Sequence, residues 1–373
     1  MERYRVALVS DWYYPKIGGI EYSIDSLASA LKKLGHEVHI ITRRYSGRDN
    51  CNSRNGIKVI RVKGRELDTR FLSPGAYWET FKILKSGNYD IIHAHGLDSP
   101  MASFSLIAGR KLGIPSVMTN HSLAGRRRMR PLLLLAGRFF LRYADAVIAV
   151  SSAVEKESKL MASGKVYRIP NGIEIEKHDR EKTEFKKDGK IVIATVARMT
   201  PKKKVIDIVD IAPEILKKHS NITFLIIGDG PLRKKIEKRT RELGVSENFY
   251  FTGEIHREEV LNLLENSEIF ALPSEDEAFG ISILEAISKG VAVVARNNSG
   301  VSDIISHKKT GLLADSKTEM KMYIEKLVEN PELRQNYATS ANKELYKYSW
   351  IKIAKKTEEV YMGVINAEDF NHS

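Results

Sequence analysis

Two glutamates in the second half of the chain are the residues best spaced for chemistry. Glu277 and Glu285 stand with seven residues between them, and Phe279 and Gly280 follow shortly after the first. The apolar run Ile269–Leu272 predicts a buried strand, so Glu277 is expected in a strand-to-helix loop and Glu285 about two turns into the helix. In a doubly wound sheet, that loop is where ligands bind.

The same loop has the features of an anion site beside a polyol site. Exposed backbone amides of Phe279 and Gly280 at a helix start would suit an anion, because unpaired N–H groups and the helix dipole converge there. Glu277 could then bind hydroxyl groups that the amides do not reach. Taken alone, the pattern is equally typical of an ordinary helix start with an acidic first turn.

Glycines and histidines at other strand ends add candidates. Gly18 and Gly19 follow the first predicted strand, and paired glycines let a backbone approach a phosphate closely, although a lone pair is more often a tight turn. His121 ends a strand and could hydrogen-bond a substrate, yet a strand-end histidine is more often structural. His93 and His95 have no further metal ligand at a useful spacing, so no chemistry is assigned to them.

A basic cluster comes directly after His121. Arg126, Arg127, Arg128 and Arg130 precede a leucine-rich segment, an arrangement typical of an interfacial membrane segment. The alternative is a core helix beside a solvated basic loop. We expect the helix to be mostly core and the arginines to face a membrane or an acidic acceptor.

Composition restricts the class of protein. The chain has 373 residues, enough for two domains, and a formal net charge of +13, which favours anionic partners. The single Cys51 cannot form an internal disulfide, which fits a reducing cytoplasm. Neither a signal peptide nor an apolar run of membrane-spanning length is present in the sequence. The chain has a single glutamine, Gln335, and abundant Lys, Arg and Glu, and this composition favours a heat-adapted source.

Strands alternate with helices along the whole chain, as in the predicted helix Tyr22–Leu34 that stops at Gly35. The expected strands of the first half are Val6–Ser10, Glu37–Thr42, Ile57–Val62, Ile91–Ala94, Ser116–Thr119 and Ala146–Val150. Those of the second half are Ile191–Ala197, Thr223–Ile227, Tyr250–Thr252, Ile269–Leu272 and Ala292–Ala295. This alternation implies α/β architecture with parallel sheets and right-handed crossovers.

The sequence therefore predicts two doubly wound, Rossmann-like domains with a cleft between their sheet edges. The expected parts are a first domain over residues 1–172, a charged linker over 173–190 and a second domain over 191–347. Residues 348–373 are expected to form a C-terminal helix.

In this order, the motifs resemble those of retaining nucleotide-sugar glycosyltransferases of the family 4 type. The Glu277-x7-Glu285 spacing with Phe279-Gly280 is similar to the family's donor-site signature. The matching landmarks cover nearly the whole chain: Gly18–Glu21, Thr119–Leu123, Arg198 with Lys203, Gly228–Pro231, Phe251–Ile255 and, more loosely, residues 299–303 and 310–313. Leu8–Glu21 and Thr119–Leu123 look closest to members that transfer N-acetylglucosamine to phosphatidylinositol. Lys204 departs from the pattern, because the family usually has glycine there.

The resemblance implies the GT-B fold and transfer of a hexose or N-acetylhexosamine from a nucleotide sugar, expected to be a UDP-sugar, to a lipid-linked or glycan acceptor. Arg198 and Lys203 would bind the diphosphate, whose negative charge grows as the glycosidic bond breaks. Glu285 would bind the ribose, Glu277 the sugar hydroxyls, and His121 would lie beside the reacting sugar. The remaining implied donor contacts are Gly19, Gly228, Glu254, Phe279, Gly280 and Ile281.

The resemblance also implies an acceptor site near Asp11, Tyr13 and arginines 126, 127, 128 and 130, and a C-terminal helix that crosses back onto the first domain. No cofactor and no metal are expected, because the sequence has no Asp-x-Asp motif and the cations can replace Mg²⁺. No carboxylate is evidently placed as a covalent nucleophile, so same-face attack is expected. The protein is expected in the cytoplasm, with peripheral contact to the inner face of an anionic membrane and without nucleic acid.

Several alternatives stay open at this point. A nucleotide-sugar epimerase or a phosphorylase would share the two-domain layout. A non-catalytic binder of anionic membrane or nucleic acid would explain the charge of +13. A protein that needs a partner chain for activity is a further possibility.

Overall fold

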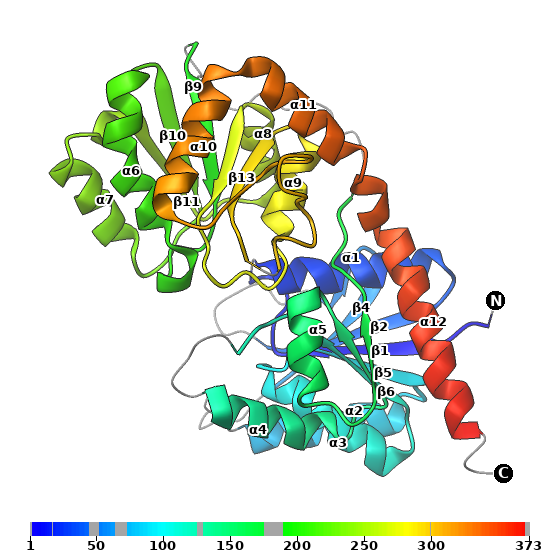
Figure 1. The fold of residues 1–373 in the computed structure, drawn as a ribbon. Coiled ribbons are helices and arrows are strands. Elements are labelled where there is room, and N and C mark those ends of the chain that lie inside the picture. Colours follow the sequence, from blue (N-terminus) through cyan, green and yellow to red (C-terminus); the bar gives the residue numbers. More distant parts are fainter. Residues whose placement is uncertain are drawn as a thin grey trace. The chain divides into compact units, whose positions relative to one another are not determined.

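The computed structural model describes residues 2–16, 18–44, 52–63, 73–124, 130–174, 189–298 and 300–369. The chain divides into two compact units, the first made of residues 1–172 with 348–373 and the second of residues 173–347. Each unit is a largely parallel sheet with helices packed on it (Figure 1). Both units are doubly wound, so the predicted α/β fold class is confirmed.

The first unit has an eight-stranded sheet in the order β3-β4-β2-β1-β5-β6-β7-β8. Only the β3–β4 pair is antiparallel among the described strands of this sheet. Strands β1, β5 and β6 are almost entirely buried, as expected where helices cover both faces of a parallel sheet. The strands are β1 (Arg5–Ser10), β2 (Glu37–Arg43), β3 (Ser53–Arg54), β4 (Ile57–Val62), β5 (Ile91–His95), β6 (Ser116–Asn120), β7 (Ala146–Ala149) and β8 (Lys165–Arg168).

The helices of the first unit come from both ends of the chain. They are α1 (Gly19–Lys33), α2 (Pro74–Ser86), α3 (Pro100–Leu112), α4 (Arg130–Leu141), α5 (Ser152–Lys159) and α12 (Trp350–Asp369). Helix α1 begins three residues before the predicted Tyr22 and ends, as predicted, just before Gly35, whose φ of 102° suits a helix stop. The C-terminal α12 packs on α1.

Three buried polar contacts hold α12 in the first unit. The Trp350 indole N–H donates to the Tyr22 hydroxyl at 3.2 Å. His36 Nε2 lies 3.2 Å from a carboxylate oxygen of Glu358. The Tyr361 hydroxyl, further along the helix, lies 2.6 Å from Nδ1 of a histidine in β5. Because each contact is buried, the helix is an integral layer of this unit.

The second unit has a six-stranded parallel sheet in the order β11-β10-β9-β12-β13-β14. The strands are β9 (Ile191–Val196), β10 (Ile222–Ile227), β11 (Phe249–Gly253), β12 (Ile269–Leu272), β13 (Ala292–Arg296) and β14 (Leu312–Ala314). The helices are α6 (Val205–Lys218), α7 (Arg233–Glu242), α8 (Arg257–Glu265), α9 (Ile281–Ser288), α10 (Lys317–Glu329) and α11 (Pro331–Asn342). The short strands β3, β8 and β14 were not predicted.

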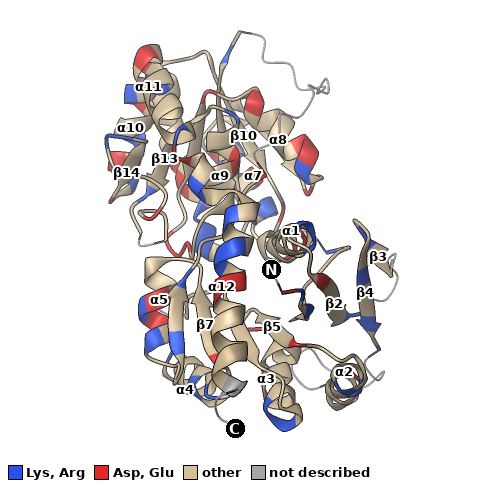
Figure 2. Cartoon of the chain, turned by 90° about the vertical axis from the view of Figure 1, so that its right-hand side faces the viewer, with Lys and Arg blue, Asp and Glu red and all other residues tan. Residues whose placement is uncertain are grey.

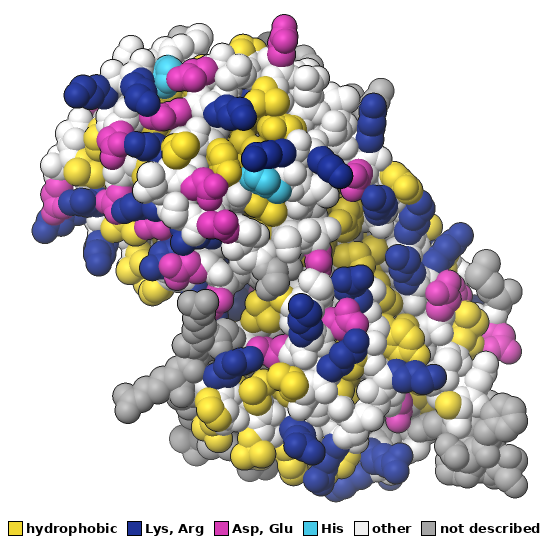
Figure 3. Space-filling model, in the orientation of Figure 1, with side chains coloured by type: hydrophobic (Ala, Val, Ile, Leu, Met, Phe, Trp, Pro, Cys, Tyr) yellow, Lys and Arg dark blue, Asp and Glu magenta, His cyan; other side chains and the backbone are white. Residues whose placement is uncertain are grey.

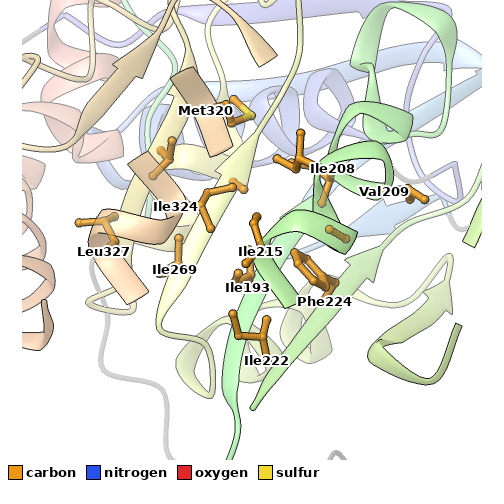
Figure 4. Packing of buried hydrophobic residues seen from close by; sticks show 14 of the residues in the cluster. Ile193, Ile208, Val209, Ile215, Ile222, Phe224, Ile269, Met320, Ile324 and Leu327 are labelled. Carbon is orange, nitrogen blue, oxygen red and sulfur yellow. The ribbon is translucent and has the colours of Figure 1, made fainter. Parts of the chain in front are cut away.

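The core of the second unit lies between this sheet and helices α6 and α10 (Figure 4). Ile208 and Ile215 of α6 and Ile324 of α10 face Ile193 of β9 and Phe224 of β10, and all five side chains are fully buried. Burial of a side chain of this size contributes about 1.5–3 kcal/mol. This packing fixes the sheet from which the site loops extend.

In each sheet the chain order reverses at one point. From β9 the chain moves outward through β10 to β11, and it then returns to β12 on the other side. In the first unit the equivalent reversal lies between β1 and β5. Ligands of doubly wound sheets bind outside the carboxyl ends of the strands at such reversals.

Candidate functional site

Two loops meet at the strand reversal of the second unit. One loop follows β9 and the other follows β12, which are neighbours in the sheet. Lys203 Nζ lies 2.6 Å from Glu277 Oε2 and joins the two loops. Two residues that the sequence proposed for the same ligand are therefore in direct contact.

Two further ion pairs flank the Lys203–Glu277 contact. Lys202 lies 3.9 Å from Asp276, and Lys204 lies 3.4 Å from Glu275. The backbone amide of Glu275 also donates to the carbonyl of Lys202 at 3.0 Å. We call these residues, 202–204 and 275–277, the charge ladder. Partly exposed pairs of this kind contribute at most about 1 kcal/mol each, so the ladder mainly sets the position of the loops.

Arg198 is an exposed cation on the same loop as the lysines of the charge ladder. Its guanidinium forms no ion pair or hydrogen bond with any residue that the structure describes, whereas all three ladder lysines are paired. The loop beneath it is held by the Met199 amide, which donates to the Asp229 carbonyl at 2.9 Å. An unpaired arginine on a fixed loop can bind an anion without first breaking an internal contact.

Gly228 supports the Arg198 loop from below. It directly follows β10, has a φ of 123° and donates its amide to the Gly253 carbonyl at 3.0 Å. A Cβ at Gly228 would lie 2.5 Å from the carbonyl oxygen of Ala197, immediately before Arg198. Only glycine fits such a close approach, so its role in the structure is to let the two loops pack together.

Glu285 is buried inside α9 and paired with an arginine that sequence reasoning missed. It is the fifth residue of α9, so it lies just over one turn into the helix and the expected depth of two turns is wrong, because the helix begins only at Ile281. Arg257 Nε donates to Glu285 Oε1 at 2.9 Å. Burial raises the pKa of the Glu285 carboxyl, and the neighbouring Arg257 opposes that shift.

The expectation of exposed amides at the start of α9 is also wrong. Phe279 is only 3 % exposed, and Gly280 is buried as well. The large apolar Phe279 side chain favours burial, which draws this segment into the fold. Gly280, with a φ of 101°, serves as the N-cap, and Ile281 is half-buried. Glu254, directly after β11, is exposed.

In the first unit, the predicted acceptor residues Asp11 and Tyr13 are buried and already engaged. Asp11 Oδ2 accepts hydrogen bonds from the Ser99 hydroxyl and the Met101 amide, both at 2.8 Å. The Tyr13 hydroxyl donates to the Asp25 carboxylate, and burial beside this carboxylate raises the pKa of Tyr13. These side chains fix the loop after β1, and Gly19, at the start of α1, is exposed beyond it.

His121 lies next to the two histidines that received no chemistry from the sequence. It directly follows β6 and is half-buried. His95 Nδ1 lies 3.2 Å from His121 Nε2, and the two rings stack with centroids 5.5 Å apart. Burial lowers the pKa of His121 to about 4 and that of His93 to about 3. All three rings are therefore neutral at pH 7, since the pKa of His95 is also lowered well below its usual value.

The predicted basic cluster is described only in part. Arg126, Arg127 and Arg128 lie outside the described residues, whereas Arg130 is the first residue of α4 and is exposed. Arg130 lies 3.7 Å from Glu157 of α5.

Helix α4 is not the core helix that its leucines predicted. Leu132, Leu135 and Phe139 are 56 %, 66 % and 46 % exposed, and only Gly137 and Leu141 of this helix are buried. A Cβ at Gly137 would lie 2.4 Å from the Met161 sulfur, so the helix contacts the unit closely along a narrow strip. The other apolar side chains gather on the surface, with basic residues beside them (Figure 3).

The described residues contain no cluster of His, Cys, Asp or Glu side chains suited to a metal ion. None of the helices in this part of the chain has both the length and the apolar character needed to cross a bilayer. Lys and Arg are spread over both units in the view of Figure 2 rather than gathered in one stripe.

Comparison with known proteins matches each half of the chain to a family model. Residues 17–177 match the model described as Glycosyltransferase Family 4, and residues 176–344 match Glycosyl transferases group 1. The chain is 30 % identical over 375 residues to an Arabidopsis thaliana protein that is a subunit of phosphatidylinositol N-acetylglucosaminyltransferase. That alignment covers 96 % of this chain and 81 % of the relative.

Solved structures share the arrangement of elements. Sucrose-phosphate synthase from Thermosynechococcus elongatus is similar with a TM-score of 0.83 and 19 % identity, covering 98 % of this chain and 100 % of that chain. The Anabaena protein HepE in complex with UDP and glucose is similar with a TM-score of 0.80 and 18 % identity, covering 96 % and 100 %. At these identities the likeness shows the fold alone.

Proposed function

Because this chain belongs to the glycosyltransferases of the GT-B fold, with a family 4 domain followed by a group 1 domain, we propose that it transfers a sugar from a UDP-sugar to a lipid-linked acceptor with retention of configuration. Transfer from a nucleotide sugar is the activity of the family. The sugar is proposed to be a hexose or N-acetylhexosamine, and the first acceptor to test is phosphatidylinositol, which the name of the Arabidopsis relative contains.

The donor is proposed to bind at the strand reversal of the second unit. The observation that carries this proposal is the exposed Arg198 guanidinium, unpaired within the described residues, on the same loop as the Lys203 that contacts Glu277. A nucleoside diphosphate is a dianion or more at neutral pH, so Arg198 can bind it at once and Lys203 can share its charge between phosphate and Glu277. UDP in the complex of the similar HepE supports uracil as the base of the donor.

Glu285 is proposed to bind the ribose of the donor, and Glu277 the sugar that is transferred. One oxygen of the buried Glu285 carboxylate accepts a hydrogen bond from Arg257, and the other can accept hydrogen bonds from the ribose hydroxyl groups. Glu277 lies in the loop between β12 and α9 and is held by Lys203. There it can accept hydrogen bonds from hydroxyls of the transferred sugar. Gly228 acts by allowing the loops to pack, and Glu254 lies after β11 on the same sheet edge.

The chemical step is proposed to be same-face attack without a metal. The departing phosphate gains negative charge, and fixed cations stabilise that charge more in the transition state than in the ground state. Arg198 and Lys203 supply such cations from this chain, and the leaving phosphate accepts the proton of the attacking hydroxyl. His121 of the first unit is proposed to hydrogen-bond the transferred sugar. EDTA should leave turnover unchanged; loss of turnover that Mg²⁺ restores would contradict this step.

The acceptor is proposed to be presented by an anionic bilayer that the first unit touches at the cytoplasmic side. Helix α4 exposes Leu132, Leu135 and Phe139, and its Arg138 and Arg130 are exposed as well. An apolar strip edged with arginines is typical of a helix that lies in a membrane interface.

A thermal-shift screen against UDP-, GDP- and ADP-sugars without metal tests the donor site first. A ligand that binds only the folded state raises the free energy of unfolding, by about 2.7 kcal/mol at a hundredfold excess over Kd, and so raises the unfolding midpoint. We expect a shift confined to UDP-sugars. No shift with any nucleotide sugar would overturn the proposal.

Arg198→Gln and Arg241→Gln form a matched pair for the same site. Arg241 is also exposed but lies in the last turn of α7, which runs away from the site edge of the sheet. Losing one transition-state charge contact lowers kcat by about 10²–10³-fold. We expect such a loss in kcat/KM for Arg198→Gln and wild-type kinetics for Arg241→Gln. Equal kinetics in the two variants would exclude Arg198 from the donor site.

Transfer is then measured with radiolabelled UDP-sugars and vesicles that contain phosphatidylinositol, in the full-length chain. Labelled lipid is the expected product. Conversion of the UDP-sugar without any acceptor would instead identify an epimerase. Donor binding with no labelled lipid on any phospholipid or glycan would exclude this acceptor class for the isolated chain.

A further inference from the structure

Two buried histidines and one half-buried histidine of the first unit, His93, His95 and His121, lie on one face of its sheet. His93 and His95 are two residues apart on β5, and Thr119 is opposite His95 on β6. His121 is two residues beyond Thr119, so the four polar side chains share one face at the carboxyl ends of the two strands. This inference rests on the proposed function, in which His121 lies beside the transferred sugar.

Both ring nitrogens of His93 already have hydrogen-bond partners, so His93 cannot hydrogen-bond to His95 or His121. Its Nδ1 lies 2.6 Å from the Tyr361 hydroxyl of α12, and its Nε2 lies 2.6 Å from the Thr119 hydroxyl. The His95 ring lies against it, with the centroids 4.1 Å apart. His93 therefore fixes the place of the His95 ring through packing rather than through a hydrogen bond.

His95 has one partner and one bare nitrogen. Its Nδ1 contacts His121 Nε2 at 3.2 Å, whereas its buried Nε2 has no hydrogen-bond partner within the described residues. A neutral imidazole carries one proton, on either nitrogen. A proton on Nε2 would be a buried donor without an acceptor, which is rarer in proteins than a bare acceptor. The proton of His95 therefore belongs on Nδ1.

This placement determines the state of His121. If His95 Nδ1–H donates, then His121 Nε2 must accept and the single proton of His121 must sit on Nδ1. Nδ1 of His121 has no partner among the residues that the structure describes, and the residue is only half-buried. The proton is thus held at the nitrogen that is still available to a ligand.

We propose that His95 is a positioning residue that holds His121 in the Nδ1–H tautomer, so that His121 donates a hydrogen bond from Nδ1 to a hydroxyl oxygen of the transferred sugar. The opposite tautomer would present a lone pair to the sugar and could only accept. His95 touches neither the donor nor the acceptor in this arrangement; it acts through the ring of His121.

The tautomer is measured directly in full-length protein labelled with ¹⁵N-histidine, by long-range ¹H–¹⁵N correlation at pH 7. Signals of His121 are assigned by their loss in His121→Asn. We expect a protonated Nδ1 and an unprotonated Nε2 for His121. A protonated Nε2 overturns the inference, whatever the activity. This readout needs no substrate, so it can fail or succeed independently of the proposed function.

Substitutions at His95 test its consequence for turnover. His95→Asn places an amide N–H where Nδ1–H stood and should keep both the His121 spectrum and kcat within a few-fold. His95→Phe removes the donor but fills the space, and should lower kcat roughly tenfold or more with little change in KM for the UDP-sugar, because the nucleotide is bound by the second unit. His39→Phe, a partly buried histidine within β2, is the control and should retain wild-type kinetics.

Wild-type kcat in a folded His95→Phe variant would overturn the inference. If His95→Phe does not fold, the spectra of the wild type and of His95→Asn still test the inference. Full activity in a His95→Asn variant whose His121 has changed its tautomer would also overturn it. A correct tautomer in a protein that transfers no sugar would leave the inference intact and sink the proposed function instead.

Discussion

At the scale of single residues, the loop after β9 contains one position where this chain departs from its family. Lys204 follows the Lys203 of the charge ladder, and its φ is 48°, in the left-handed region. That region costs about 1–2 kcal/mol for a residue with a side chain and nothing comparable for glycine. The glycine usual in the family thus matches the conformation, and Lys204 keeps it while adding the contact to Glu275.

Lys204→Gly and Lys204→Ala should therefore rank in an unusual order of stability. Both variants lose the exposed ion pair, which contributes about 0–1 kcal/mol, but only alanine retains the left-handed strain. We expect Lys204→Gly to be about 1 kcal/mol more stable than Lys204→Ala in urea unfolding. The reverse order, as in an ordinary helix interior, would show that the loop does not hold this conformation.

The partners of the candidate site residues were harder to predict than the residues themselves. Glu277 and Glu285 were proposed from their spacing and Arg198 and Lys203 from the resemblance, and in the structure Lys203 contacts Glu277. Arg257, the partner of Glu285, is far away in sequence and belongs to no recognised motif. The only signal was its place shortly after the carboxyl end of β11, where doubly wound sheets carry ligand residues.

At the scale of elements, α4 shows where pattern reasoning fails. Its leucines predicted a core helix, but Gly137 gives the helix a narrow contact strip and leaves the other apolar side chains outside. Aromatic contacts continue this surface into neighbouring helices: Phe140 of α4 meets Phe104 of α3, which stacks on Tyr77 of α2 at 4.2 Å. Apolar composition alone could not say which side faces the protein.

The double variant Leu132→Asn/Leu135→Asn should weaken binding to anionic vesicles. Each leucine loses several buried CH₂ groups from the interface, at about 0.8 kcal/mol each, so we expect at least a tenfold loss in vesicle co-sedimentation. Leu160→Asn is the control, because Leu160 is 62 % exposed in the same unit but outside α4. Equal binding by both variants would remove α4 from the membrane contact.

Edge strands were the elements least visible in the sequence. β3 has two residues, β14 has three, and β8 is the four-residue Lys165–Arg168 at the sheet edge. Strands this short show no measurable alternation of apolar and polar residues, and an edge strand does not need to be apolar on both faces. The long buried central strands, in contrast, were predicted to within one or two residues.

At the scale of the whole molecule, the buried histidines make the first unit sensitive to acid. In the folded state the pKa of His93 is about 3 and that of His121 about 4, against 6.5 for the free side chain. Below pH 6.5 these two histidines therefore become protonated in the unfolded chain while they stay neutral in the folded unit. Stability is fully present above pH 6.5 and is lost as the pH falls toward 4, by up to about 1.4 kcal/mol per pH unit for each histidine.

The measurement is thermal unfolding followed by tryptophan fluorescence between pH 7 and pH 4.5. Trp12, Trp78 and Trp350 all belong to the first unit, so the signal reports that unit. The midpoint should fall with pH, and His93→Gln should flatten the fall. His256→Asn, an exposed histidine of the second unit, should leave the curve unchanged. A wild-type slope in His93→Gln would contradict the assignment of the acid sensitivity to this cluster.

The return of α12 to the first unit has a consequence for synthesis on the ribosome. Residues 1–172 are translated early, but α12, which belongs to the same unit, is translated only after the whole second unit. Until Tyr361 leaves the exit tunnel, His93 Nδ1 lacks its partner, and until Trp350 is made Tyr22 lacks the indole. The second unit, which is continuous in sequence, can finish folding before the first. A stop codon before or within α12 will therefore damage the unit whose larger part is made first.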